Sequence, residues 1–237
     1  MAKTKRSKTQ PRAAALWQAI RRQLVRMVGA VAVLGVALVA LWGVINPPTT
    51  AYMLSEGWRL GGVKHKWTAL EDMAPVLARS VVAAEDANFC GHWGFDIDAI
   101  KRAIAAGGQN GASTLTQQTV KNVYLWHGRS YLRKALEAIL TPVVEAVWTK
   151  RRIVEVYLNV AEFDAGVFGA DAAARHYFGV APSQLSPAQA ARLAAVLPAP
   201  KQRSAQRPSA EVTARARAIM DGAATIGKDG RAQCFES

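Results

Sequence analysis

Two stretches decide how this chain is interpreted: AEDANFCGHWGFD, residues 84–96, and GASTLTQQTVKN, residues 111–122. The first places carboxylates, a histidine and aromatic rings in one short segment that follows an apolar, helix-like run. The second contains hydroxyls, amides and a single lysine, with almost no net charge. A soluble core does not require so many uncharged hydrogen-bonding groups in succession, whereas a site that binds a sugar or a phosphate does.

The spacing of apolar residues predicts a mainly helical domain around these stretches. Apolar side chains recur three and four positions apart between Met73 and Ala84, which indicates one helical stripe. Asp96 and Ser113 are typical N-cap residues for helices that start after them, and Pro142 should kink its helix. No sustained period-two alternation and no repeat is present. We expect further helices over residues 97–106, 113–122, 131–148, 151–160, 166–177, 186–197 and 208–226, with a loop at 107–111.

The N-terminal sequence predicts a membrane anchor. Residues 1–26 carry eight basic and no acidic side chains, and residues 27–45 carry no charge at all. Nineteen such residues are enough to cross a bilayer, and the preceding basic block keeps the N-terminus in the cytoplasm. A cleaved signal peptide is the alternative, but its apolar core is typically shorter, about 7–15 residues.

The remaining composition sets the domain boundaries and excludes a nucleic-acid partner. We expect a basic arm over 1–26, a transmembrane anchor over 27–45, a connector over 46–66, a domain over 67–205 and a C-terminal helix and tail over 206–237. The net charge of +13 is concentrated in the arm, without the aromatic–basic alternation typical of RNA binding. Attraction to anionic lipid head groups explains the arm.

Cys90 and Cys234 could form a disulfide or stay as two free thiols.

Four motifs carry a resemblance to a known family. Besides the two stretches above, they are RKALE at 133–137 and KRRIVEVYLN at 150–159, in the family's order across residues 67–200. The chain resembles the monofunctional biosynthetic peptidoglycan transglycosylases of glycosyltransferase family 51, whose module also occurs in bifunctional penicillin-binding proteins. The resemblance implies a lysozyme-like helical domain behind one N-terminal transmembrane helix. It also implies polymerisation of lipid II into glycan strands, with release of undecaprenyl pyrophosphate.

Glu85 matches the family's catalytic base. The acceptor is a sugar 4-hydroxyl, which attacks with inversion only if a carboxylate removes its proton. Glu85 follows an apolar stripe, which favours a partly buried base over a solvated helix end. Asp86, Phe89 and His92 are expected to support it, with a structural role most suitable for His92.

The pyrophosphate requires cations and polar hydrogen bonds in the transition state. The candidates for this binding surface are Lys121, Arg129, Arg133, Ser113, Thr114, Gln117, Gln118 and Asn122. Ser113, Gln117 and Lys121 are four residues apart, on one helical face. We expect Lys121 to face solvent. Asn110 stands where many relatives carry a basic residue, which affects how the loop before this surface closes on the donor.

Glu137 matches a second functional glutamate of the family. It could orient basic side chains or hold a divalent ion, Mg or Mn, against the pyrophosphate; a purely structural salt bridge is an equal alternative. The sequence requires no cofactor. Glu155, Tyr157 and Asn159 are expected to be structural, and Glu162 has no assigned role.

Two other functions compete with the glycan polymerase. One is a membrane-anchored peptidoglycan hydrolase or lytic enzyme on the same fold, which would need a protonated acid for a sugar leaving group. The other is a non-catalytic cell-division scaffold, which the two glutamates argue against. The expected partners are lipid II, the growing glycan chain, the membrane and cell-wall synthesis or division proteins. The expected location is the bacterial inner membrane, with the domain in the periplasm.

Overall fold

A computed structural model describes residues 10–107, 111–128 and 130–236 of the chain, with side-chain surroundings from Ala14 onward. The basic residues before Gln10, Arg129 and most of the expected loop at 107–111, including Asn110, therefore lie outside the described residues. The chain divides into two compact units, residues 1–42 and residues 43–237. Each unit is described by itself.

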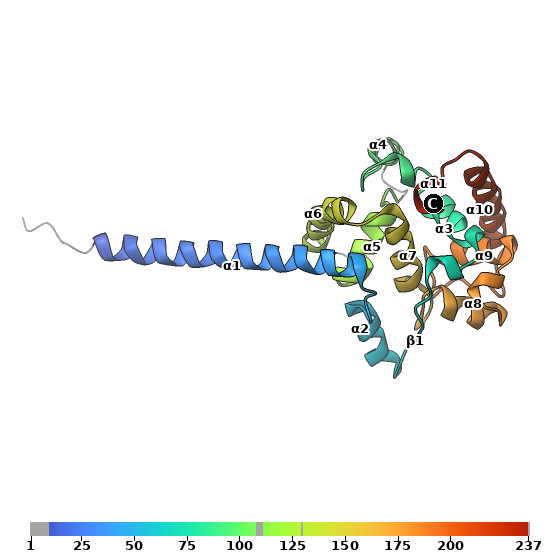
Figure 1. Ribbon diagram of the computed structural model, residues 1–237, viewed down its shortest axis with the longest axis horizontal. Coiled ribbons are helices and arrows are strands. Elements are labelled where there is room, and N and C mark those ends of the chain that lie inside the picture. The colour runs from blue at the N-terminus through green and yellow to red at the C-terminus, as the bar shows by residue number, and fades with distance from the viewer. Residues whose placement is uncertain (1–9, 108–110, 129, 237) are drawn as a thin grey trace, which may run out of the picture. The chain divides into compact units, whose positions relative to one another are not determined.

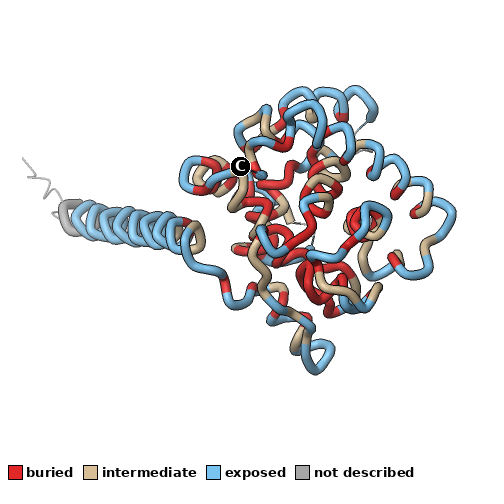
Figure 2. Tube along the Cα trace, turned by 45° about the vertical axis from the view of Figure 1, so that its right-hand side comes forward, coloured by how far each residue is buried: buried red, intermediate tan, exposed pale blue. Residues whose placement is uncertain are grey.

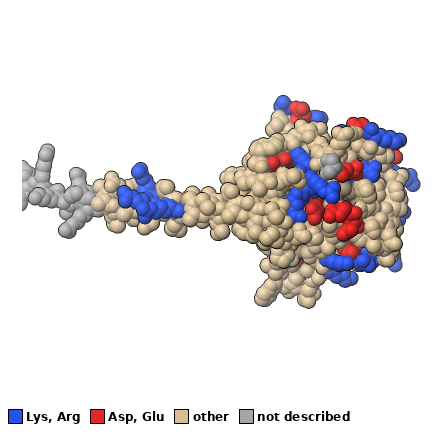
Figure 3. All heavy atoms as spheres, viewed as in Figure 1, with Lys and Arg blue, Asp and Glu red and all other residues tan. Residues whose placement is uncertain are grey.

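The first unit is formed by helix α1, Gln10–Val44, which continues to the start of the second unit. The segment Ala14–Val44 is long and apolar enough to cross a membrane. Figure 3 shows the basic side chains gathered on one section of α1, followed by an uncharged section, and Figure 2 shows that the helix is largely exposed. One N-terminal apolar helix is thus confirmed. It begins inside the segment expected to be a separate arm, so residues 10–26 of that segment and the anchor form one continuous helix.

The second unit is mainly helical, as predicted. Its helices are α2 (Ala51–Leu60), α3 (Pro75–Glu85), α4 (Ile97–Ala105), α5 (Leu115–Tyr124), α6 (Tyr131–Val147), α7 (Lys150–Val160), α8 (Ala170–Phe178), α9 (Pro187–Val196), α10 (Ala210–Lys228) and α11 (Gln233–Glu236). Short 3-10 turns lie at Leu70–Asp72, Phe89–Gly91 and Pro182–Gln184. Pro142 lies inside α6, which continues beyond it.

The helices of this unit pack in two groups (Figure 1). Helices α3, α9 and α10 pack together, and α5 packs against both α6 and α7. The buried face of α3 includes Leu77 and Val81, whose side chains are inaccessible to solvent. Burying these apolar side chains is the main term that stabilises the arrangement, and it holds the C-terminal end of α3 in a fixed place.

A small sheet was not expected from the sequence. Its strands are β1 (Lys64–His65), β2 (Glu162–Asp164) and β3 (Val167–Phe168), in the order β1-β3-β2, with β1 parallel and β2 antiparallel to β3. Strands of two or three residues are too short for alternation to be visible in the sequence. The helix expected from residue 166 is wrong at its start, because residues 167–168 pair in the sheet and α8 begins only at Ala170.

Local capping signals were correct at one helix and displaced by one residue at another. Asp96 caps α4 as predicted, with its carboxylate 2.7 Å from the Ala99 amide. The Ser113 cap is wrong, because Thr114 caps α5 instead. Thr114 accepts a hydrogen bond from the Gln117 amide, and the Gln117 side chain accepts one from the Thr114 amide. This reciprocal capping box satisfies two backbone N–H groups, whereas a lone serine cap would satisfy one.

The two ends of the compact unit, which the sequence analysis set apart as connector and tail, belong to it structurally. Helix α10 packs on α3 and α9, and α2 packs on α5. Cys90 and Cys234 form a disulfide with their Cα atoms 5.7 Å apart. Beside it, Phe235 is fully buried, with its ring 6.4 Å from that of Phe89. The C-terminal end is therefore tied to the segment that follows Glu85.

Removing this disulfide should destabilise the compact unit. The bridge closes a loop with a sequence separation of 144 residues, for which the chain-entropy relation gives up to about 5 kcal/mol. We expect the double variant Cys90→Ser, Cys234→Ser to melt at a lower temperature than the oxidised protein, as measured by circular dichroism. Reductant should lower the melting temperature of the parent and leave that of the variant unchanged. Equal melting temperatures for oxidised parent and variant would contradict this role.

Candidate active site

Glu85 is the last residue of α3 and the centre of the candidate site. Its Oε2 atom accepts a hydrogen bond of 2.8 Å from Nε2 of Gln118 on α5. Only 12% of the Glu85 side chain is exposed. Because α3 is buried along its length, the carboxylate is held by a rigid element. The two stretches that decide the sequence interpretation therefore meet directly at this contact.

Gln118 is itself oriented by a third helix. The Tyr157 hydroxyl, from α7, donates to Oε1 of Gln118 at 3.2 Å, so the amide nitrogen is directed to Glu85. Burial raises the pKa of Tyr157 well above its usual range, which keeps the hydroxyl a neutral donor. Tyr157 was expected to be purely structural, but it also lines a pocket beside Gln118.

Behind Glu85, the first motif forms a support. The Asp86 carboxylate lies 2.8 Å from Nε2 of His92 and accepts a 2.9 Å hydrogen bond from the Leu115 amide. Phe89 is buried, and the ammonium group of Lys150 lies 4.2 Å above its ring. Asp86 thus links the ends of α3 and α5, with His92 on its other oxygen, while the supporting role of Asp86, Phe89 and His92 in the reaction stays a prediction.

Several polar residues expected to bind substrate are engaged within the protein. Thr114 and Gln117 form the capping box, and the Thr114 hydroxyl also donates to the Gly94 carbonyl at 2.7 Å. Ser113 precedes α5, so it does not share a helical face with Gln117 and Lys121 as expected. Its hydroxyl instead accepts a 3.2 Å hydrogen bond from Lys134.

Glu137 is enclosed by cationic side chains. Arg133 donates to its Oε2 atom at 2.8 Å, and Lys134 pairs with Oε1. The side-chain nitrogen of Gln117 also lies 3.4 Å from Oε1. Both carboxylate oxygens are therefore occupied, which does not fit a metal ligand. The described residues also contain no group of three or more His, Cys, Asp or Glu side chains placed to hold a metal ion. The geometry favours an ion-pair role that orients Arg133 and Lys134.

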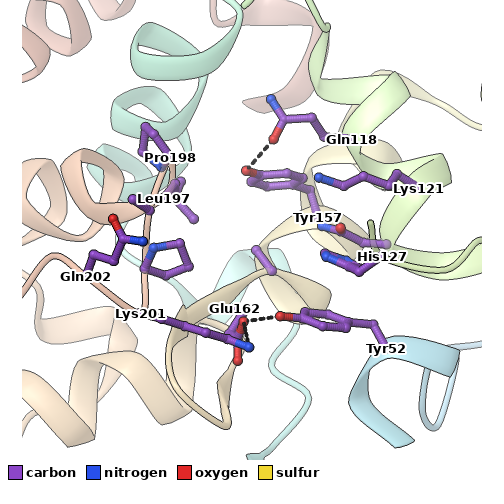
Figure 4. A pocket seen from close by; sticks show the side chains of 14 residues that line it. Tyr52, Gln118, Lys121, His127, Tyr157, Glu162, Leu197, Pro198, Lys201 and Gln202 are labelled. Carbon is purple, nitrogen blue, oxygen red and sulfur yellow. Dashed lines mark hydrogen bonds and ion pairs between the residues drawn. The ribbon is translucent and has the colours of Figure 1, made fainter. Parts of the chain in front are cut away.

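A pocket of about 370 Å³ lies beside the Gln118–Tyr157 contact (Figure 4). Lys121 extends into it from α5, and Asn122 lines it too. Lys121 was expected to face solvent, but its side chain is partly buried, and this burial lowers its pKa. Among the described residues it makes no hydrogen bond or ion pair. Arg129, the other cation expected here, lies outside the described residues.

The opposite wall of this pocket contains residues that the sequence analysis did not select. The Tyr52 hydroxyl donates to Glu162, and the His127 ring stacks on Tyr52 with centroids 3.4 Å apart. The Lys201 ammonium lies 2.9 Å from Glu56 and 3.6 Å from Glu162. Glu162, left without a role by sequence, therefore fixes two pocket-lining side chains.

A second pocket, of about 320 Å³, is lined by Glu85 itself, together with Asp86, Arg102 and Ser113. Glu85 faces this second pocket, while its hydrogen-bond partner Gln118 lines the first. Glu85 thus lines one pocket and contacts, through Gln118, a residue that lines the other.

Comparison with known proteins identifies relatives for nearly the whole chain. The family described as transglycosylase matches residues 55–224. The biosynthetic peptidoglycan transglycosylase of Jannaschia sp. (strain CCS1) is 57% identical over 231 residues, covering 98% of this chain and 97% of the relative. The protein of the same name from Pseudomonas entomophila (strain L48) is 52% identical, covering 77% of this chain and 81% of the relative. That from Caulobacter vibrioides is 43% identical, covering 84% and 89%.

The stacked histidine gives a prediction about acid stability. Desolvation of the His127 ring, assisted by nearby Lys121 and Lys201, lowers its pKa from 6.5 to about 4. Unfolding therefore takes up a proton between these values, so the free energy of unfolding falls as the pH drops from about 6.5 to about 4. We expect His127→Gln to make this slope shallower in denaturant titrations across pH. The variant should retain part of this pH dependence, because burial also lowers the pKa of His65. An identical slope in the variant would contradict the assignment to His127.

Proposed function

The chain belongs to the transglycosylase family, and from this premise we propose that it polymerises lipid II into the glycan strands of peptidoglycan with release of undecaprenyl pyrophosphate. The observation that carries the proposal is the position of Glu85. It lines one pocket and is hydrogen-bonded through Gln118 to the wall of another that contains an unpaired lysine. A base between an acceptor site and an anion site is what glycosyl transfer from a pyrophosphate requires.

Glu85 serves as the general base. Its Oε2 atom is bound by Gln118, whereas Oε1 accepts no hydrogen bond from the described residues. In the reaction the Glu85 carboxylate takes the proton of the acceptor 4-hydroxyl as that oxygen bonds to the donor's anomeric carbon. The bond from that carbon to the pyrophosphate breaks with its electron pair, and attack from the side opposite the leaving group inverts the configuration. A positioned base of this kind is typically worth about 10²–10⁴-fold in rate.

The first pocket is assigned to the departing pyrophosphate. Lys121 enters this pocket without a partner among the described residues, so a phosphate oxygen would satisfy an ammonium group that the protein leaves unsatisfied. Lys201 adds a second cation, held in place by Glu56. Negative charge grows on the leaving group in the transition state, so these cations bind the transition state more strongly than the ground state. The second pocket, lined by Glu85, is assigned to the acceptor sugar.

The leaving group also separates this function from glycan hydrolysis. A hydrolase on a similar fold must protonate a sugar leaving group, whereas a pyrophosphate needs cations. The proposed mechanism contains no step through a divalent ion, because both oxygens of Glu137 are engaged by neighbouring side chains. Incubation with lipid II tests the assignment: long glycan polymer supports it, and cleavage of preformed glycan without polymer would reject it.

The location is proposed from α1 and the disulfide together. The uncharged part of α1, from Met27, follows basic residues, which supports a cytoplasmic N-terminus and a compact unit on the periplasmic side of the inner membrane. The Cys90–Cys234 disulfide supports this orientation, because disulfides form and persist in the periplasm and are rare in the cytosol. A lipid-linked substrate would then reach the site from the membrane that holds the enzyme.

Glu85→Gln should abolish polymerisation without unfolding the protein. The amide preserves the size of the side chain and can still contact Gln118, but it cannot accept the hydroxyl proton. Turnover of fluorescent lipid II and the melting temperature are measured on the same preparation. Near-normal turnover in the folded variant would remove Glu85 from the mechanism.

Lys121→Met should lose most of the turnover and keep or raise the melting temperature. Burial lowers the pKa of Lys121, so charging it costs stability in the folded state below its usual pKa. Methionine removes this cost together with the phosphate contact. Lys101→Met, at an exposed position on α4, is the matched control and should behave as the parent. A large fall in melting temperature with normal activity in the folded fraction would instead identify Lys121 as structural.

A further inference from the structure

We propose that Arg215 of α10 is a positioning residue for the catalytic carboxylate of Glu85. This inference rests on the proposed function, since it assumes that Glu85 is the base. Arg215 lies outside the four motifs that first indicated the site. Its role comes only from the way the C-terminal helix packs on α3.

The contact places a cation at the unbound oxygen of Glu85. The Nη2 atom of Arg215 lies 3.7 Å from Oε1 of Glu85 and donates to the Ala84 carbonyl at 3.3 Å. The hydrogen bond to Ala84 falls in the last turn of α3, where carbonyls lack helical partners and the helix dipole favours a positive charge. Arg215 therefore contacts both the helix end and the side chain that this end carries.

Helix α10 is anchored well enough to hold the guanidinium in place. Val212, Ala216 and Ile219 are buried on the side of α10 that packs in the core. The Arg215 side chain is 36% exposed and its Nε atom has no hydrogen-bond partner among the described residues. The arginine is thus not a fully satisfied core ion pair, and its one charged contact in the described chain is Glu85.

The distance of 3.7 Å decides what the arginine does. It is too long for a strong hydrogen bond, so Oε1 keeps a free lone pair for the acceptor proton. It is short enough for the positive charge to attract the carboxylate and to hold its orientation. Gln118 fixes one oxygen of Glu85 and Arg215 orients the other toward the acceptor.

The other elements around Glu85 do not supply an equivalent ion pair. Lys121 from α5 acts on it only through longer-range attraction, and Tyr157 from α7 is neutral. The neighbouring Asp86 carboxylate is engaged with His92 and the Leu115 amide. Within the described residues, Arg215 is the one cation at ion-pair distance from Glu85.

The experiment compares full-length Arg215→Met, Arg215→Gln and Arg215→Lys with the parent, using lipid II polymerisation across pH. We expect Arg215→Met and Arg215→Gln to lower kcat by about tenfold to a hundredfold, as expected for a misplaced catalytic group, with KM changed less than twofold. Arg215→Lys, which keeps the positive charge at this position, should restore most of the kcat. Arg217→Met, an exposed arginine on the same helix, is the control and should match the parent.

Each outcome separates this inference from the proposed function. A parental kcat in Arg215→Met would overturn it, as would a loss of activity that follows the loss of folded protein. If neither Arg215→Met nor Arg215→Gln folds, Arg215 is structural and the inference is wrong. Glu85→Gln is measured alongside. If the parent forms no polymer, the proposed function fails; if Glu85→Gln is active, Glu85 is not the base and the premise of this inference fails; if Glu85→Gln is inactive while Arg215→Met behaves as the parent, only the role of Arg215 fails.

Discussion

The contact between the Asp86 carboxylate and the start of α5 is the constraint on which the site depends. One oxygen of Asp86 accepts from the Leu115 amide, and the other lies against His92. A buried carboxylate needs such partners, and without them it would strongly destabilise the fold. Because Asp86 follows Glu85 directly and Leu115 opens the helix that carries Gln118, this single group sets how the two helix ends face each other. The hydrogen bond between Glu85 and Gln118 is a consequence of that arrangement.

Much of the sequence could be interpreted correctly because its signals are local. The uncharged run in α1, the apolar stripe of α3 and the Asp96 cap each depend on residues a few positions apart. Prediction failed for two different reasons. The small sheet pairs strands that are distant in sequence and too short to alternate visibly. The cap of α5 is a local signal that was placed one residue early, because Gln117 lies three positions after Thr114 and completes the capping box there.

The residues of the candidate site also divide into those that the sequence could identify and those that it could not. Glu85, Gln118 and Lys121 could be selected by sequence because they stand in motifs whose residue types suit the chemistry. Lys201 and Arg215 could not, because only the packing of α10 and of the segment after α9 brings them near residues that are distant in sequence. Residue type alone is also not enough to establish a binding role, since Thr114 and Gln117 were expected to bind substrate and instead cap α5.

The contrast between satisfied and unsatisfied polar groups locates the chemistry more sharply than the motifs do. Glu137, Thr114 and Asp86 are polar and buried, and each has its full set of partners, so they stabilise the fold. Lys121 is partly buried without a partner among the described residues, and the buried Oε1 of Glu85 accepts no hydrogen bond there. Leaving a buried polar atom unpaired costs stability. We propose that a ligand supplies the missing partners, a phosphate for the lysine and a hydroxyl for the glutamate.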